Sequence, residues 1–118
     1  MKRRTLQPDA APADALDALC DALLTAQSRP QLRALLLDLC TPAELEALSD
    51  RWHVIPLLLD GLPYREIHDR TAVSVTTIGR VARCLVQGAG GYRSAAAALG
   101  LADPSSLAAA PATETSNR

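Results

Sequence analysis

A group of small and basic residues between positions 74 and 83 has the clearest chemistry in the sequence. It comprises Ser74, Val75, Thr76, Thr77, Gly79, Arg80 and Arg83, at the start and on the outer face of a predicted helix. Thr hydroxyls can hydrogen-bond base edges or phosphates, Val and Thr methyl groups can contact thymine methyls, and Arg can reach guanine or phosphate. These residue types predict contact with double-stranded DNA through the major groove.

The helix that carries these residues is the second of a predicted pair. The pattern predicts one helix from about residue 63 to 71 and another over 75–87, with Ser74 as the N-cap of the second. A short helix, a turn of about three residues and a longer helix make a helix-turn-helix. In the turn, Ala72 stands where Gly is often found. The residues expected to pack the two helices together and on the core are Ile67, Val73, Ile78, Ala82 and Leu85.

Charge is distributed unevenly along the chain, whose net charge is −1. Residues 1–50 carry five Lys or Arg against eight Asp or Glu, hence −3, whereas residues 61–93 carry five Arg against two acidic residues, hence +3. A locally basic segment is what phosphate contact requires; an ordinary solvated face is the alternative. Within this segment, Arg65 is predicted to contact a phosphate or a flanking base, and His68 a phosphate.

Two leucine-rich stretches nearer the N-terminus have the apolar period of amphipathic helices. Asp14 is expected to cap the first, and residues 28–30 separate the two. The first stripe contains Leu16, Leu19, Cys20, Leu23 and Leu24, and the second contains Leu32, Leu35, Leu36, Leu39 and Cys40. Each stripe predicts one helix face that must be covered by other apolar groups.

A third helix has the strongest start signal in the chain. Thr41 stands at the N-cap, Pro42 at the first helical position and Glu44 three residues after the Thr, which makes a capping box. Gly61 is expected to end this helix, and Pro56 inside it to kink it. Its predicted apolar stripe is Leu45, Leu48, Trp52, Ile55 and Leu59.

Composition and segment boundaries complete the predicted organisation. The sequence has no Phe, one Trp and two Tyr among many Ala and Leu residues, which favours an all-α fold. We expect a flexible arm over residues 1–13, a helical domain over 14–101 whose last helix runs from Tyr92 to Leu101, and a disordered tail over 102–118. Without a membrane-length apolar run or a signal core, we expect a cytoplasmic protein with no membrane contact.

Sites of other kinds are not predicted. The three cysteines are widely spaced and show no zinc-ligand pattern, so we expect neither a disulfide framework nor a metal site. We find no nucleophile–base pair and no phosphate loop at usable spacing, so we expect no catalytic residues and no enzyme. The alternative to a DNA-binding regulator is a helical protein–protein interaction module of the antitoxin or adaptor type, which keeps the helix pair without reading DNA.

Several motifs in this order resemble the Trp repressor superfamily, in particular its YerC/YecD-type, TrpR-like branch. Leu39 to Leu48 (LCTPAELEAL) resembles the family's entry into its central helix, and LLDG at 58–61 followed by YREI at 64–67 resembles the next step. TTIGRVARCL at 76–85 and GAGGY at 88–92 resemble the reading helix and the turn after it. The resemblance covers about residues 32–93.

This resemblance implies an all-α fold of about six helices and an intertwined homodimer. The N-terminal helices, residues 13–40, would bury their stripes against the partner, and residues 63–87 would read DNA. It implies a sequence-specific transcriptional regulator, and more specifically a repressor.

The resemblance also bears on a small corepressor. It places Thr41, Arg51, Arg80 and Cys84 at positions that line the ligand pocket of tryptophan-binding members. Val81, however, stands where those members have a Gly that leaves room for the indole ring, and Cys84 replaces the Ser that receives the ligand amine. Because a branched side chain fills the slot and a thiol is a weak acceptor, tryptophan is not the expected effector, and another small molecule stays open.

Overall fold

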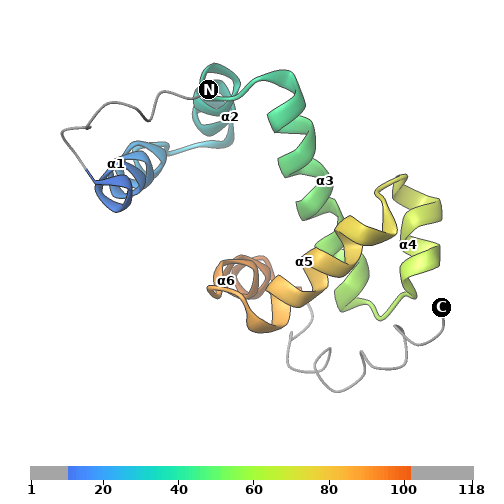
Figure 1. The fold of residues 1–118 in the computed structure, drawn as a ribbon. Helices are drawn as coiled ribbons and strands as arrows, with labels where there is room; N and C mark the ends of the chain where they lie inside the picture. The colour runs from blue at the N-terminus through green and yellow to red at the C-terminus, as the bar shows by residue number, and fades with distance from the viewer. Residues whose placement is uncertain (1–10, 102–118) are drawn as a thin grey trace. The chain divides into compact units, whose positions relative to one another are not determined.

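The computed structural model describes residues 11–101, which form six helices and no strand within that range. Figure 1 shows them in chain order: α1 (Pro12–Leu24), α2 (Arg29–Leu39), α3 (Pro42–Leu59), α4 (Tyr64–Thr71), α5 (Val75–Gln87) and α6 (Gly91–Ala98). The all-α prediction is confirmed. The chain divides into two compact units between Leu45 and Glu46. Most of the predicted arm and the whole predicted tail lie outside the described residues.

The first two helices begin at different kinds of N-terminus. The prediction that Asp14 caps α1 is wrong, because the N-cap is Ala11 and Asp14 lies in the first turn. Pro12, whose φ is already set for a helix, starts α1 two residues before the predicted domain boundary. Ser28 caps α2: its hydroxyl accepts a hydrogen bond from the Gln31 amide at 3.3 Å.

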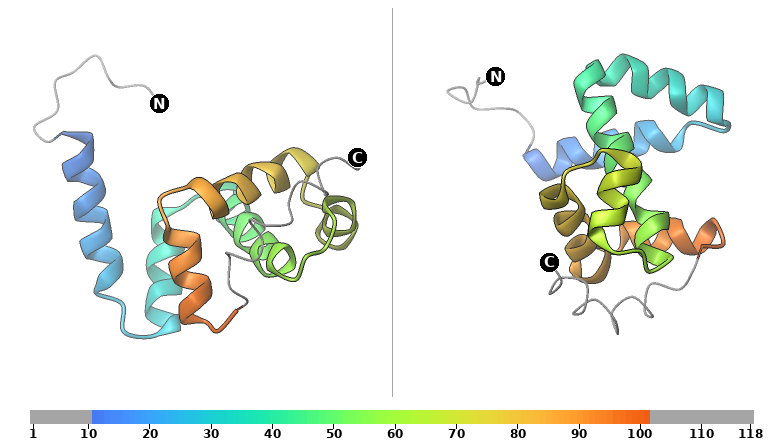
Figure 2. Two further views of the ribbon diagram at one scale, coloured as in Figure 1. Left: turned by 90° about the horizontal axis from the view of Figure 1, so that it is seen from below. Right: turned by 90° about the vertical axis from the view of Figure 1, so that its right-hand side faces the viewer.

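These two helices bury none of their residues. They are separate rods joined by a short loop (Figure 2). Six of their leucines are 37% to 79% exposed: Leu16, Leu19, Leu24, Leu32, Leu37 and Leu39. The predicted amphipathic helices are therefore present, but no residue of their apolar stripes is buried, and only Leu23, Leu35, Leu36 and Cys40 are partly covered.

Local signals define both ends of α3. The capping box is confirmed: the Glu44 amide donates to Thr41 Oγ1 at 3.1 Å, and the Thr41 amide donates to Glu44 Oε1 at 2.8 Å. The helix continues through Pro56 to Leu59. Gly61, at φ 81°, then donates to the Leu58 carbonyl at 3.0 Å, which is the predicted glycine C-cap.

The C-terminal unit closes around one apolar core. α4, α5 and the C-terminal half of α3 surround it (Figure 1). The core consists of Val54, Ile55, Leu58, Leu59, Ile67, Val73, Ile78, Val81, Leu85 and Ala96. Of the residues predicted to pack the helix pair, Ile67, Val73, Ile78 and Leu85 are buried, whereas Ala82 is only partly so. Val81, the residue before Ala82, is buried instead.

The predicted stripe of α3 is partly wrong. Ile55 and Leu59 are buried, but Leu48 is exposed, and Val54 and Leu58 belong to the core. The sequence from Val54 to Leu59 is apolar on every side of the helix, so its period does not select one face.

The last helix packs against α5 and holds its C-terminal end. A Cβ atom at Gly88 would lie 2.4 Å from the Cys84 carbonyl oxygen, so only Gly allows the chain to leave α5 along this path. Arg93 donates from Nε to the Leu85 carbonyl at 3.1 Å and from Nη2 to the Val86 carbonyl at 2.9 Å. Between residues 11 and 101, the helices are too short or too polar to cross a membrane.

Candidate nucleic-acid interface

The candidate interface is the helix-turn-helix made by α4, the turn Ala72–Ser74 and α5. The two helices pack against each other, as the spacing predicted. Ile67 from α4 and Ile78 from α5 are fully buried beneath the turn residue Val73. The inward side of the unit is therefore occupied by the core, which leaves the other side of α5 to solvent.

The N-terminus of α5 is built by the predicted cap. Ser74 Oγ accepts from the Thr77 amide at 3.1 Å and donates to Thr77 Oγ1 at 3.0 Å. These two hydroxyls are thus already paired with each other. Val75 and Thr76, the next two residues of the first turn, are exposed. Exposed methyl groups and a hydroxyl at a helix N-terminus suit contact with base edges.

The five arginines of the basic segment fall into two classes. Arg70 Nη2 pairs with Glu66 Oε2 at 2.7 Å, and Arg93 holds the end of α5. The other three, Arg65, Arg80 and Arg83, are exposed and form no ion pair or hydrogen bond with any described residue. These three are the arginines that the sequence predicted to contact DNA. Cationic side chains without an internal partner are available to phosphates and base edges.

Gly79 lies on the same helix, with no packing reason for being a glycine. A Cβ atom there would have Tyr64 Cε2 as its nearest neighbour, at 3.9 Å, which is an ordinary contact. Gly in the interior of a helix costs about 0.5–1 kcal/mol relative to Ala. The packing of the described residues therefore does not require Gly at this position.

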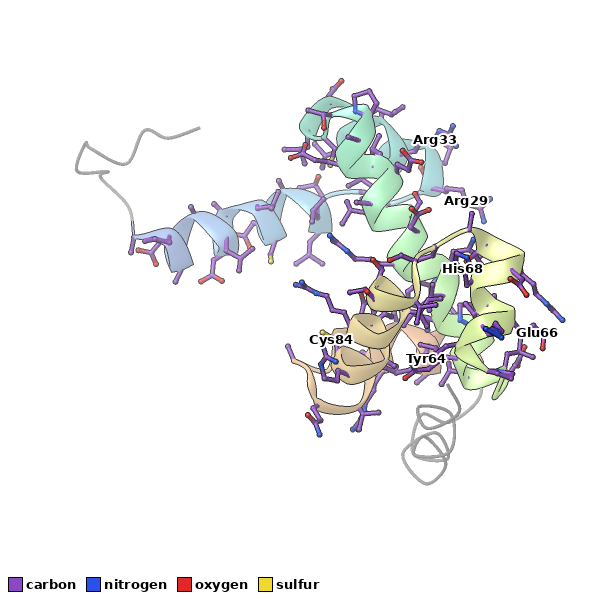
Figure 3. The ribbon with its side chains drawn as sticks, turned by 45° about the vertical axis from the view of Figure 1, so that its right-hand side comes forward. Arg29, Arg33, Tyr64, Glu66, His68 and Cys84 are labelled. Atoms are coloured by element: carbon purple, nitrogen blue, oxygen red, sulfur yellow. The ribbon has the colours of Figure 1, made fainter. Side chains whose placement is uncertain are left out.

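Like Ser74 and Thr77, His68 is a predicted contact that already has a partner in the protein. It projects from α4 (Figure 3), and its Nδ1 lies 2.8 Å from the Val73 carbonyl oxygen in the turn. Neither this bond nor the Arg93 bonds to α5 were expected from the sequence. Both depend on side chains that reach five or more residues along the chain, for which no periodic pattern exists.

The predicted ligand-pocket residues lie in both units. Thr41 belongs to the N-terminal unit, where it caps α3. Arg51 in α3, and Arg80 and Cys84 in α5, belong to the C-terminal unit, and Cys84 is exposed. Val81 is 1% exposed and is part of the core. Among residues 11–101, no three His, Cys, Asp or Glu side chains come together as a metal site would require.

Comparison with known proteins decides the family. The sequence model of the Trp repressor protein family matches residues 14–99, which includes the whole helix-turn-helix. The chain belongs to the Trp repressor family. This is a family of DNA-binding helix-turn-helix regulators. The expected resemblance, and with it the fold, is confirmed.

Members of the same branch are similar in both sequence and structure. YerC, an uncharacterised protein of Bacillus subtilis strain 168, is 35% identical over 80 residues, which are 68% of this chain and 77% of that protein. A TrpR-like protein from Eubacterium eligens superposes with a TM-score of 0.71 at 31% identity, covering 76% of this chain and 93% of the other. A second solved chain, from Staphylococcus aureus, has a TM-score of 0.71 at 33% identity, with 76% and 90% covered. This chain is therefore a YerC-type, TrpR-like protein.

Proposed function

We propose that the protein is a sequence-specific transcriptional repressor that reads the major groove with α5. The observation that carries the proposal is the division of α5 into two faces. Ile78, Val81 and Leu85 face the core, while exposed Val75 and Thr76, together with Arg80 and Arg83, face outward. We expect Arg65, which is exposed at the start of α4, to contact a flanking phosphate. This arrangement is the one by which helix-turn-helix proteins bind DNA.

The repressor acts as a homodimer in this proposal. Neither α1 nor α2 buries a residue, although their exposed leucines include one that is 79% exposed, Leu24. Monomeric soluble proteins rarely expose extended rows of leucines, which mark interaction surfaces. A second copy of the chain, presenting the same leucine face, would cover it symmetrically.

The reading helix of the proposed repressor does not depend on tryptophan. The support is Val81, which is 1% exposed and stands where the resemblance places a Gly that leaves room for an indole ring in tryptophan-binding members. We expect the equilibrium dissociation constant for the operator to be the same with and without added tryptophan. A tryptophan-dependent increase in affinity would contradict this part of the proposal.

The test is selection of bound duplexes from a random DNA pool at fixed, near-physiological salt without added ligand. Salt is fixed because non-specific affinity falls steeply as it rises. We expect enrichment of a near-palindrome whose half-sites are about one helical turn apart. Placing the selected sequence upstream of a reporter gene then tests repression: transcription is expected to fall when the protein is supplied.

Two matched variants connect this result to α5. Arg80→Ala with Arg83→Ala should abolish specific retention of the selected duplex. The salt dependence of the remaining non-specific binding should fall by about one unit for each phosphate contact removed. Arg70→Ala is the control, because that guanidinium is paired with Glu66. Equal effects of both variants would contradict DNA reading by α5. No enriched sequence with the wild type would leave either a missing corepressor or an interaction module, and ligand screening would then separate these two. Partner binding that survives Arg80→Ala with Arg83→Ala would instead favour an interaction module.

A further inference from the structure

The turn between α4 and α5 is held by two side chains from α4. Thr71 Oγ1 donates to the Ile67 carbonyl at 2.8 Å and accepts from the Val73 amide at 3.0 Å. His68 Nδ1 lies 2.8 Å from the Val73 carbonyl oxygen. A carbonyl oxygen can only accept, so Nδ1 carries the proton and donates. Both backbone polar groups of Val73 are therefore bonded to α4 side chains.

These bonds flank a strained residue. Ala72 has φ 67°, in the left-handed region, and within residues 11–101 it is the only non-glycine residue with positive φ. A residue with a Cβ pays free energy to adopt that conformation, and it persists only where the surroundings enforce it. The Ala72 amide donates to the His68 carbonyl at 2.8 Å, and the bonds to Val73 fix the next residue. His68 thus contacts the strained turn through both its backbone and its ring.

The bond from His68 also acts on the start of the reading helix. The Val73 carbonyl and the Ser74 amide share one peptide plane, and Ser74 caps α5. Fixing this plane fixes the direction in which Val75 and Thr76 leave the turn. We infer that His68 is a positioning residue of the reading unit, whose Nδ1–H donor sets the entry of α5. The consequence for DNA specificity rests on the function proposed above, whereas the consequence for the turn does not.

Three substitutions at this position separate positioning from phosphate contact. His68→Asn keeps an N–H donor near the place of Nδ1 but carries no charge. His68→Lys carries a charge but lacks a donor held close to the turn, and His68→Ala has neither. The measurement is the ratio of specific to non-specific dissociation constants, on the selected duplex and a scrambled one, over a salt series.

A positioning role predicts that Ala and Lys raise this ratio by about tenfold, because specific binding weakens as on loss of one hydrogen bond, while Asn stays close to the wild type. Non-specific affinity and its salt dependence should not change in His68→Ala and His68→Asn. The opposite order would overturn the inference: Lys near the wild type and Asn impaired, with the salt dependence reduced by about one unit, is the signature of a phosphate contact.

A second measurement needs no DNA. Amide hydrogen exchange of Thr77 and Ile78 reports the cap directly, because these amides donate to Ser74 Oγ and to the Ser74 carbonyl. We expect faster exchange at both amides in His68→Ala, near wild-type exchange in His68→Asn, and partial recovery when Ala72→Gly is added to His68→Ala. Unchanged exchange in His68→Ala would overturn the inference even if no DNA sequence is ever selected.

Discussion

The two units of this chain use the same kind of apolar helix in opposite ways. In the C-terminal unit, residues such as Ile55, Ile67 and Ile78 are fully buried in one core. In the N-terminal unit, α1 and α2 are at least as rich in leucine, yet no residue of either helix is buried. Apolar periodicity therefore identifies the apolar face of a helix, but it does not tell whether residues of the same chain bury that face.

The outward faces of the two units differ as well. The N-terminal unit presents leucines, which suit another protein surface. The C-terminal unit presents a first turn with Val75 and Thr76, followed by Arg80 and Arg83. In the proposed function, the first unit contacts a protein partner and the second a polyanion, and each contact can be tested separately.

The largest expected effect comes from opening the closed core. Ile67→Ala removes a side chain that is 0% exposed between α4 and the rest of the core, and should lower the free energy of unfolding by about 2–5 kcal/mol. Denaturant unfolding followed by circular dichroism measures this. The control is Leu99→Ala in the same unit, 65% exposed, which should change stability by no more than about 0.5 kcal/mol. Equal losses would contradict the assignment of the core.

The second effect concerns assembly. Leu16→Asp together with Leu19→Asp places two charges on the exposed face of α1 and should raise the dimer dissociation constant by about a hundredfold or more, because burying an unpaired charge is costly. Sedimentation equilibrium should then give a monomer mass where the wild type gives a dimer. Asp14→Ala, on the same helix, is the control. A wild type that is monomeric at all concentrations would remove the proposed reason for the exposed leucines.

A smaller effect is expected in the turn. Ala72→Gly removes the Cβ from a left-handed residue and should stabilise the C-terminal unit by about 1 kcal/mol, once the greater chain entropy of Gly is subtracted. A rise in thermal midpoint of a few degrees measures it. Destabilisation would mean that the turn in solution does not have the left-handed geometry.

The smallest effect separates stability from function on α5. Gly79→Ala should raise the free energy of unfolding by about 0.5–1 kcal/mol, because Ala is the better helix former and the added methyl meets nothing closer than 3.9 Å. Affinity for the selected DNA should fall at the same time, if the missing side chain makes room for the duplex. A variant that gains stability and keeps full affinity would remove Gly79 from the interface.

Much of the fold could be predicted because its helix ends are local. The capping box at Thr41, the cap at Ser74 and the glycine at Gly61 are each decided by residues within one turn of one another. The inward faces of the helices were harder to predict. Ala82 was expected in the core, but its neighbour Val81 is buried instead, since both residues fit the same helical period. The predicted apolar face of α3 was also partly wrong, because the run from Val54 to Leu59 is apolar on every side of the helix.

The site could be predicted in its residue types but not in its internal contacts. Arg65, Arg80 and Arg83 were identified from charge and spacing alone, and the structure leaves all three exposed. The hydrogen bonds of His68 and Arg93 could not be predicted from the sequence, because a side chain bonded to a carbonyl five or more residues away leaves no periodic pattern. Arg93 was counted with the basic segment although it holds the end of α5.

The two-faced build of α5 has a consequence for how such a protein can diversify. Its inward residues and the groups that hold its two ends are distinct from Val75, Thr76, Arg80 and Arg83. Helix-compatible substitutions at those four positions therefore leave the buried residues and the bonds at the helix ends in place. If α5 reads DNA as proposed, a duplicated gene can acquire a new operator through these positions without losing its fold. A combinatorial library of helix-compatible residues at the same positions should then yield folded proteins with altered base preferences.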